Sequence, residues 1–152
     1  MIRKARVADV VEIQKMLRDF ADAGSILARS LSELYTTLRD LVVYEDEDRR
    51  IVGCCALHIL WDDLAEIRSL AVLDPYRRQG IGRSLVEECV SEAVKLGLAR
   101  VFALTYEVDF FKRLGFRTVD KNMFPQKVWW DCHNCPKFPN CDESALVLDL
   151  SA

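Results

Sequence analysis

The sequence lacks a hydrophobic run long enough to cross a membrane, and it also lacks an apolar leader. Its longest apolar stretches, such as 51–61, are interrupted by polar residues well before the roughly 20 residues that a membrane-spanning helix needs. Residues 1–6 alternate as a strand does and contain no apolar core followed by a small-residue cleavage site. We therefore expect a cytoplasmic protein with no membrane partner.

A strong charge bias is absent as well. The formal net charge is −3, which provides no general attraction to nucleic acid, so no nucleic-acid partner is expected. Local clusters of arginine can still bind a compact anion such as a phosphate group.

There are no internal repeats and no low-complexity segments. With 152 residues, of which 51% are hydrophobic, the chain can build one substantial core, so we expect a single domain over 1–152. An irregular segment rich in cysteine, proline and tryptophan is expected at 121–144.

Helical and strand periodicities alternate along the chain, which predicts an α/β (α+β) fold. We expect a mixed, mostly antiparallel central sheet of about six to seven strands, flanked by about four helices. The helices are predicted at 10–20, 30–38, 85–96 and 110–114, and the strands at 1–6, 41–44, 51–61, 64–73, 101–104, 116–119 and 145–150.

The most informative segment joins a strand to a helix through a basic loop that contains Gly80 and Gly82. Backbone N–H groups at a helix N-terminus are unpaired and lie at the positive end of the helix dipole. Glycine lets an anion approach the main chain, and Arg77, Arg78 and Arg83 add positive charge. The loop therefore predicts a phosphate site, although turns and close helix packing use glycine as well.

The string Arg77-x-x-Gly80-x-Gly82, together with Phe-Lys-Arg-Leu-Gly-Phe at 111–116, resembles the GNAT acetyltransferase superfamily over nearly the whole chain. The resemblance implies acetyl-CoA as co-substrate, with its pyrophosphate on the loop 78–83 and its pantetheine arm along the strand 70–72. The residues implied for acetyl-CoA binding are Leu70, Ala71, Val72, Arg77, Arg78, Gln79, Gly80, Ile81, Gly82 and Arg83.

Three further stretches, at 30–35, 66–72 and 127–143, resemble short, single-domain N-acetylglutamate synthases. That family acetylates the α-amino group of glutamate in the first step of arginine biosynthesis. The resemblance implies an amino-acid N-acetyltransferase with glutamate as its acceptor.

Acetyl transfer needs a base for the amine and a proton for the departing thiolate. Glu66, just before the pantetheine strand, is the candidate base, and its alternative is a strand-end carboxylate that pairs with Arg68. Many GNAT enzymes use a tyrosine as the acid, but here that position is Phe111. Tyr106 becomes the substitute, although it can also be a packing residue, and a coenzyme thiolate can leave without a dedicated acid.

The two carboxylates of glutamate require cationic partners. Arg29, Arg68 and Lys127 are the candidates for substrate binding, and each of them can equally be a surface charge.

The tail contains Cys132, Cys135 and Cys141, of which the first two have a metal-like spacing. A second such pair is missing, so no metal is expected, with structural zinc as the lesser alternative. Among the other candidates, His58 alternates within a strand and is predicted to be structural rather than a base.

Two other functions stay open from sequence. One is a GNAT acetyltransferase for another small amine or a peptide N-terminus, and the other is a non-catalytic acetyl-CoA-binding sensor. A zinc-dependent interaction module on the tail is a third alternative. The last strand, 145–150, could exchange or pair across a homodimer.

Overall fold

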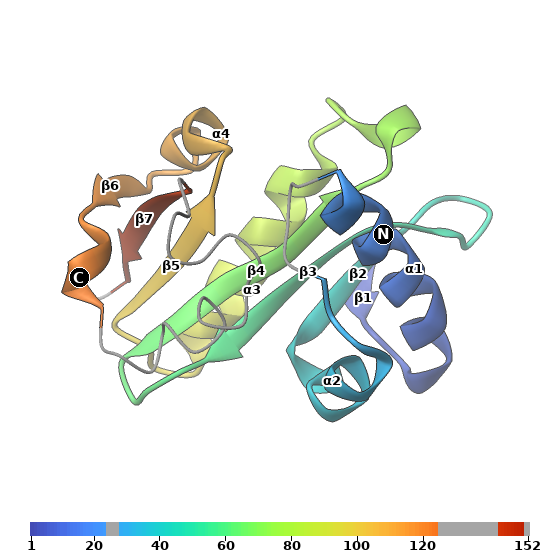
Figure 1. Cartoon of the computed structure of the whole chain (residues 1–152), viewed down its shortest axis with the longest axis horizontal. Coiled ribbons are helices and arrows are strands. Elements are labelled where there is room, and N and C mark those ends of the chain that lie inside the picture. Colours follow the sequence, from blue (N-terminus) through green and yellow to red (C-terminus); the bar gives the residue numbers. More distant parts are fainter. Residues whose placement is uncertain (24–27, 125–142, 151–152) are drawn as a thin grey trace.

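The computed structural model describes residues 1–23, 28–124 and 143–150, which form a seven-stranded sheet with helices on both faces (Figure 1). The order across the sheet is β1-β2-β3-β4-β5-β7-β6, and every neighbouring pair is antiparallel except β4 with β5. The predicted fold class is confirmed. The strands are β1 (Ile2–Lys4), β2 (Leu41–Glu45), β3 (Ile51–Ile59), β4 (Leu64–Val72), β5 (Arg100–Thr105), β6 (Arg117–Val119) and β7 (Ser144–Asp149).

Four α-helices and four short 3-10 turns connect these strands in the described residues. None of these helices is long and apolar enough to cross a membrane. The helices are α1 (Val10–Asp22), α2 (Leu31–Thr36), α3 (Ile81–Lys95) and α4 (Val108–Arg113), and the 3-10 turns are η1 (Val7–Asp9), η2 (Leu38–Asp40), η3 (Asp74–Tyr76) and η4 (Lys121–Met123).

The apolar spacing along the chain explains where the helices pack. In α1, Val10, Ile13 and Leu17 lie on one stripe and are completely buried. A capping box of Ser30 and Glu33 starts α2, because the Glu33 backbone N–H donates to the Ser30 hydroxyl at 3.1 Å and the Ser30 N–H donates back to the Glu33 carboxylate at 3.5 Å. Both helices therefore begin where their sequence indicates.

The helices form two layers around the sheet. On one face, α1 and α2 pack against β2 and β3, with Leu34 and Leu17 in the same buried cluster as Val43. On the other face, α3 places Leu85 and Val86 against the central strands. Figure 1 shows α1 and α2 in front of the sheet and α3 behind it.

The structure adds the position of the final strand, which the sequence did not predict. β7 lies between β5 and β6 and pairs with both of them, and local periodicity cannot reveal such pairing between distant segments. The glycine loop is shorter than expected, since α3 already begins at Ile81 and Gly82 lies in its first turn.

Candidate functional site

The segment between β4 and α3 brings backbone N–H groups together at the start of a long helix. Arg78 and Gly80 both adopt left-handed backbone conformations, with φ of 64° and 80°, and Gly80 caps α3. The Gly80 carbonyl accepts hydrogen bonds of 3.0 Å from both the backbone N–H and the hydroxyl of Ser84. The first N–H groups of a helix have no partner within it and lie at the positive end of its dipole. This geometry suits a phosphate or pyrophosphate group.

A cavity of about 400 Å³ lies over this segment. Each residue expected to hold the cofactor lines it except Gln79, whose side-chain amide instead donates to the Pro75 carbonyl at 3.3 Å. Arg113 was not predicted from the sequence, because its approach to the cavity depends on how α4 packs. The lining residues include Leu70, Ala71, Val72, Tyr76, Arg77, Arg78, Gly80, Ile81, Gly82, Arg83, Phe110 and Arg113.

Two of the predicted arginines are held in place by neighbours. The Arg77 guanidinium lies 5.7 Å from the centre of the Phe20 ring and 3.6 Å from the Asp74 carboxylate. Arg83 pairs with Glu87, one helical turn further on, at 2.6 Å. These contacts orient positive charge beside the cavity without burying it, so the guanidinium groups remain accessible to an anion.

Strands β4 and β5 separate beyond the first part of their pairing. The parallel ladder joins only Leu64–Glu66 to Arg100–Phe102, although β4 continues to Val72 and β5 to Thr105. A second cavity, of about 120 Å³, occupies the opening between them. It shares Phe20, Leu70, Arg77 and Glu107 with the larger cavity, so the two adjoin. The β4–β5 ladder does not extend to 70–72, the stretch that the resemblance assigns to the pantetheine arm.

A β-bulge lies in β4 where this opening begins. Cys54 is paired with Ala71, but Ala56 is paired with Arg68, so β4 has one more residue than β3 in this interval. Ser69 is in the bulge with a φ of 56°, and its carbonyl accepts a hydrogen bond from the Cys54 thiol at 3.3 Å. The bulge changes the direction of β4 next to the cavity.

Glu66 and Arg68 lie together on the face of the sheet that α1 and α2 cover. Arg68 is opposite Ala56, which belongs to the same buried cluster as Leu34 of α2. The Arg68 guanidinium is 3.8 Å from the Glu66 carboxylate, and the two side chains are 13% and 14% exposed. Arg68 also lines the smaller cavity. The structure therefore brings a cation and a carboxylate to one place beside the strand opening.

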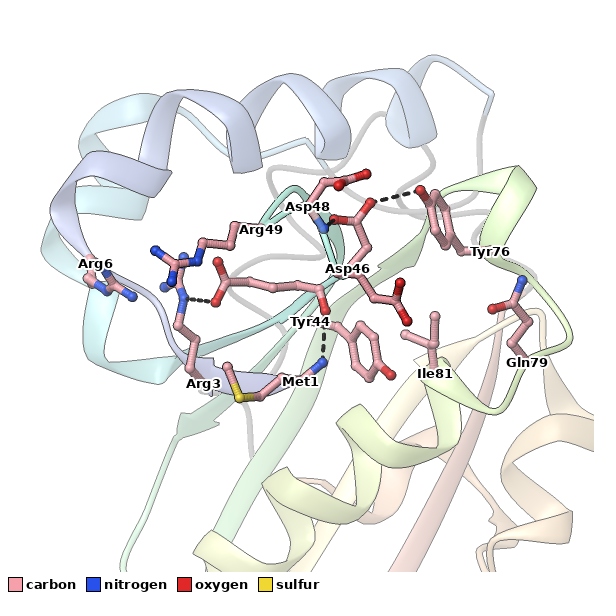
Figure 2. Close-up of a pocket in the computed structure, with 12 residues that line it drawn as sticks. Met1, Arg3, Arg6, Tyr44, Asp46, Asp48, Arg49, Tyr76, Gln79 and Ile81 are labelled. Atoms are coloured by element: carbon pink, nitrogen blue, oxygen red, sulfur yellow. Dashed lines mark hydrogen bonds and ion pairs between the residues drawn. The ribbon is translucent and has the colours of Figure 1, made fainter.

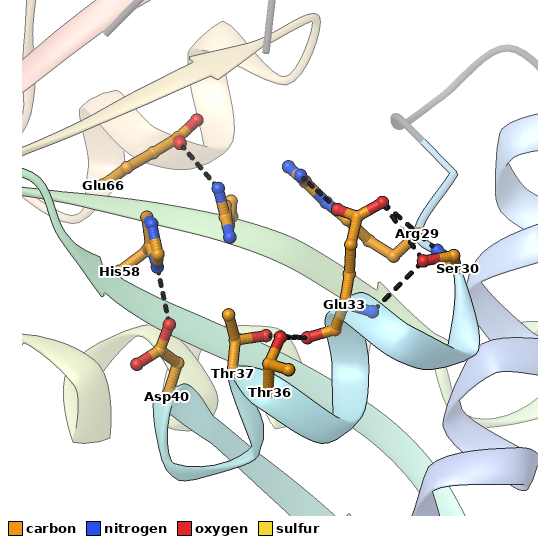
Figure 3. Close-up of polar contacts among 9 residues, drawn as sticks. Arg29, Ser30, Glu33, Thr36, Thr37, Asp40, His58 and Glu66 are labelled. Carbon is orange, nitrogen blue, oxygen red and sulfur yellow. Dashed lines mark hydrogen bonds and ion pairs between the residues drawn. The ribbon is translucent and has the colours of Figure 1, made fainter. Parts of the chain in front are cut away.

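Arg29 approaches the same face from the loop before α2. Its side chain is 8% exposed and pairs with Glu33 at 3.4 Å. Figure 3 shows this side chain extending from the start of α2 toward the sheet. Lys127, the third predicted acceptor-binding residue, lies outside the described residues.

The two aromatic residues considered as acids lie in different environments. Tyr106, just after β5, is 41% exposed and lines the smaller cavity. Phe111 is almost fully buried, with edge contacts of 5.1 Å between ring centres to both Phe110 and Phe116. Tyr106 therefore places a hydroxyl-bearing side chain at this cavity, whereas Phe111 supplies an apolar wall.

A third cavity, of about 900 Å³, lies beside η3 near the N-terminus (Figure 2). Its lining includes Tyr76, whose hydroxyl donates to the Asp46 carboxylate at 2.9 Å. This hydrogen bond raises the pKa of Tyr76. The pKa of Asp46 is lowered, and the largest cause is the hydrogen bond from the backbone N–H of Arg50. Desolvation opposes this with a smaller effect, and the hydrogen bond from Tyr76 lowers the pKa further. Because Tyr76 lines both this cavity and the one over the loop, the bond connects the β2–β3 turn to the candidate phosphate site.

Arg3 also lines this cavity and forms ion pairs. Its guanidinium donates to Asp9 at 2.7 and 3.0 Å and to Glu45 at 2.8 Å. These hydrogen bonds lower the pKa of both carboxyl groups and raise that of Arg3. Because Arg3, Asp9 and Glu45 pair with one another within the protein, we interpret these contacts as structural.

The described cysteines are core residues. Cys54, Cys55 and Cys89 are free and buried, and desolvation raises the pKa of the Cys54 thiol to about 12, so it is not a nucleophile. Among residues 1–23, 28–124 and 143–150, no group of three or more potential ligands could hold a metal ion. The tail cysteines, 132, 135 and 141, lie outside these residues, so the expectation about zinc stays a prediction.

Known proteins resemble this chain in both sequence and structure. Residues 12–116 match the family described as the acetyltransferase (GNAT) family. The chain is 44% identical over 149 residues to an uncharacterized N-acetyltransferase of Chlorobaculum tepidum, with 98% of this chain and 96% of the relative covered. It is 38% identical over 122 residues to an amino-acid acetyltransferase of Mycobacterium tuberculosis, covering 79% and 70%. N-acetylglutamate synthase of Neisseria gonorrhoeae, solved with coenzyme A and N-acetyl-glutamate, superposes with a TM-score of 0.89 at 26% identity, covering 100% of this chain and 35% of that one.

Proposed function

The chain belongs to the acetyltransferase (GNAT) family, and on that premise we propose that it transfers the acetyl group of acetyl-CoA to the α-amino group of L-glutamate. This is the reaction of an N-acetylglutamate synthase, the first step of arginine biosynthesis. The similarity to an amino-acid acetyltransferase and to a synthase solved with coenzyme A and N-acetyl-glutamate supports both substrates.

Acetyl-CoA fits the two adjoining cavities. Its pyrophosphate accepts hydrogen bonds from the N–H groups at the start of α3, and Arg77, Arg78, Arg83 and Arg113 line the cavity around it. The pantetheine arm then follows 70–72 into the opening between β4 and β5. This path delivers the thioester to the bulge at Ser69, where a backbone N–H of β4 can donate to the thioester oxygen as negative charge develops on it.

The acceptor enters from the face that α1 and α2 cover. Arg68, with help from Arg29 and Lys127, pairs with the carboxylates of glutamate. The observation that carries the proposal is the pairing of Glu66 with Arg68 in a largely buried position. A site for an amino acid needs a cation to bind its carboxylates and a carboxylate to bind its ammonium group, and this pair provides both.

The reaction follows from this placement. Glu66 takes a proton from the ammonium group, directly or through a water molecule, and the neutral amine attacks the thioester. Tyr106 is the acid that returns a proton to the departing thiolate, since Phe111 cannot.

The proposal is tested by measuring thiol release from acetyl-CoA with each common amino acid offered separately. Glutamate alone should support turnover. Arg68→Ala removes charge-assisted hydrogen bonds worth about 1.5–3 kcal/mol, so KM for glutamate should rise roughly 10- to 100-fold. Arg117→Ala, which changes an exposed arginine on β6, is the matched control and should behave as the wild type. Gly82→Trp fills the loop cavity and should abolish turnover.

The outcomes separate the alternatives. Turnover with another amine and none with glutamate would keep the acetyltransferase and reject the substrate. The buried Phe111 in place of a tyrosine favours one other function, a non-catalytic acetyl-CoA sensor. Binding of acetyl-CoA without thiol release in the presence of any amine would establish that function instead.

A further inference from the structure

His58 lies next to the proposed base, on the neighbouring strand. In the register of β3 with β4, His58 is directly opposite Glu66. Directly opposed residues of an antiparallel pair have Cβ atoms about 4.5–5.5 Å apart and share a face of the sheet. His58 therefore lies on the face that carries Glu66 and Arg68, which is the face assigned above to the acceptor.

The histidine is held by a carboxylate from a different element. Its Nδ1 is 2.6 Å from an Oδ2 of Asp40, in the 3-10 turn before β2 (Figure 3). An N–H at Nδ1 that donates to a carboxylate fixes the tautomer and leaves Nε2 as the basic nitrogen. Within the described part of the chain, Asp40 is the hydrogen-bond partner that the structure gives His58.

The pair also reaches solvent. The side chains of His58 and Asp40 are 28% and 26% exposed, about twice the values for Glu66 and Arg68. The charged groups that face His58 are Asp40 from the turn before β2 and Glu66 and Arg68 from β4, with the Arg29–Glu33 pair at the start of α2. Figure 3 shows His58 between Asp40 and Glu66. The imidazole thus lies between Glu66, which is mostly buried, and Asp40, which is more exposed to solvent.

The proposed reaction needs a route for one proton. An acceptor that arrives as an ammonium ion carries two protons that must leave its nitrogen when the amide bond forms and the carbon–sulfur bond breaks. One of them goes to the coenzyme thiolate, which becomes the free thiol, and the other must pass to solvent in every turnover. Once Glu66 has taken this second proton, it must release it before it can act as the base in the next turnover.

From this arrangement, and resting on the proposed function, we infer that the Asp40–His58 pair is a proton relay that carries the ammonium proton from Glu66 to solvent. His58 Nε2 accepts the proton from Glu66, the Asp40 carboxylate stabilises the imidazolium that results, and the imidazolium then releases its proton to water. From its alternation within a strand, His58 was predicted to be structural, and its contact with Asp40, 18 residues away, leaves no local sign in the sequence.

The inference is tested on kcat with three variants. His58→Gln keeps an N–H for Asp40 but does not titrate, and loss of a positioned proton acceptor should lower kcat about 100-fold. KM for acetyl-CoA and the melting temperature should stay unchanged. Asp40→Asn should lower kcat by less, and Asp62→Asn, an exposed carboxylate in the β3–β4 turn, is the matched control that should leave kcat unchanged.

External buffer distinguishes a relay from a structural role. In His58→Ala, kcat should rise with added imidazole at constant pH, while the wild type should not respond. Undiminished kcat in His58→Gln, or a loss of kcat that imidazole does not restore in His58→Ala, would overturn the relay while the acetyltransferase stands. Failure of the wild-type protein to release thiol with any amine would instead reject the proposed function, and the relay with it.

Discussion

The two glycines at the start of α3 should respond in opposite ways to the same substitution. Gly80 caps the helix with a φ of 80°, where an L residue costs about 1–2 kcal/mol. Alanine offsets about 0.4–1 kcal/mol of this by reducing the freedom of the unfolded chain. From the middle of each range, Gly80→Ala should lose roughly 0.8 kcal/mol, or about 2–3 °C in melting temperature for a domain of this size.

Gly82 lies in the first helical turn, and the structure leaves room for a side chain. A Cβ there would meet Phe110 at 3.5 Å and Val72 at 3.8 Å, which are ordinary contacts. Alanine is favoured over glycine within a helix by about 0.5–1 kcal/mol, so Gly82→Ala should be neutral or stabilising.

Thermal unfolding and acetyl-CoA titration of both variants test this reasoning. Gly80→Ala should melt below the wild type and bind acetyl-CoA more weakly, because the loop must reorganise around its cap. Gly82→Ala should keep its melting temperature and most of its affinity. If Gly82→Ala proves less stable than Gly80→Ala, the reasoning that the left-handed cap at Gly80 is the position most sensitive to substitution is wrong.

Two further predictions concern the polar contacts beside this loop. Tyr76→Phe removes the hydroxyl that donates to Asp46, so KM for acetyl-CoA should rise with little change in kcat, as measured by steady-state kinetics. Arg3→Met should lower the urea midpoint at pH 7, because it removes the partner that lowers the pKa of Asp9 and Glu45. Because the folded-state pKa values are lowered, these carboxylates stabilise the folded protein at pH values above their unfolded-state values of about 4. This stability is lost as the pH falls through the folded-state pKa, so the difference from wild type should close as the pH falls below about 4.

Local sequence signals were sufficient for most of the secondary structure. The apolar stripe of α1 and the Ser30–Glu33 capping box act within one or two helical turns, and the structure contains both. The strands predicted at 41–44, 51–61 and 64–73 are β2, β3 and β4, which form three successive antiparallel strands. The place of β7 was not accessible in this way, because its partners β5 and β6 lie far from it in sequence.

The candidate site likewise contains residues that the sequence could reveal and residues that it could not. The candidate phosphate loop is one continuous segment, so its glycines, its arginines and the change from strand to helix were all visible in the sequence. Arg113 reaches the cavity only through the packing of α4, and Tyr76 depends on a hydrogen bond to a residue 30 positions earlier. Neither contact leaves a periodic or compositional sign.

The architecture explains why the site forms around β4. This strand has the one parallel neighbour in the described sheet, and its pairing with β5 stops at Glu66 while both strands continue. The bulge at Ser69 then redirects β4, and α3 starts nine residues after β4 ends, within reach of the same opening. In the proposed reaction, acetyl-CoA on the loop approaches from the α3 end, and an acceptor paired with Arg68 approaches from the α1 and α2 face. On this proposal the two substrates meet at β4, so a single strand supplies the proposed base, the acceptor cation and the main-chain groups for the thioester.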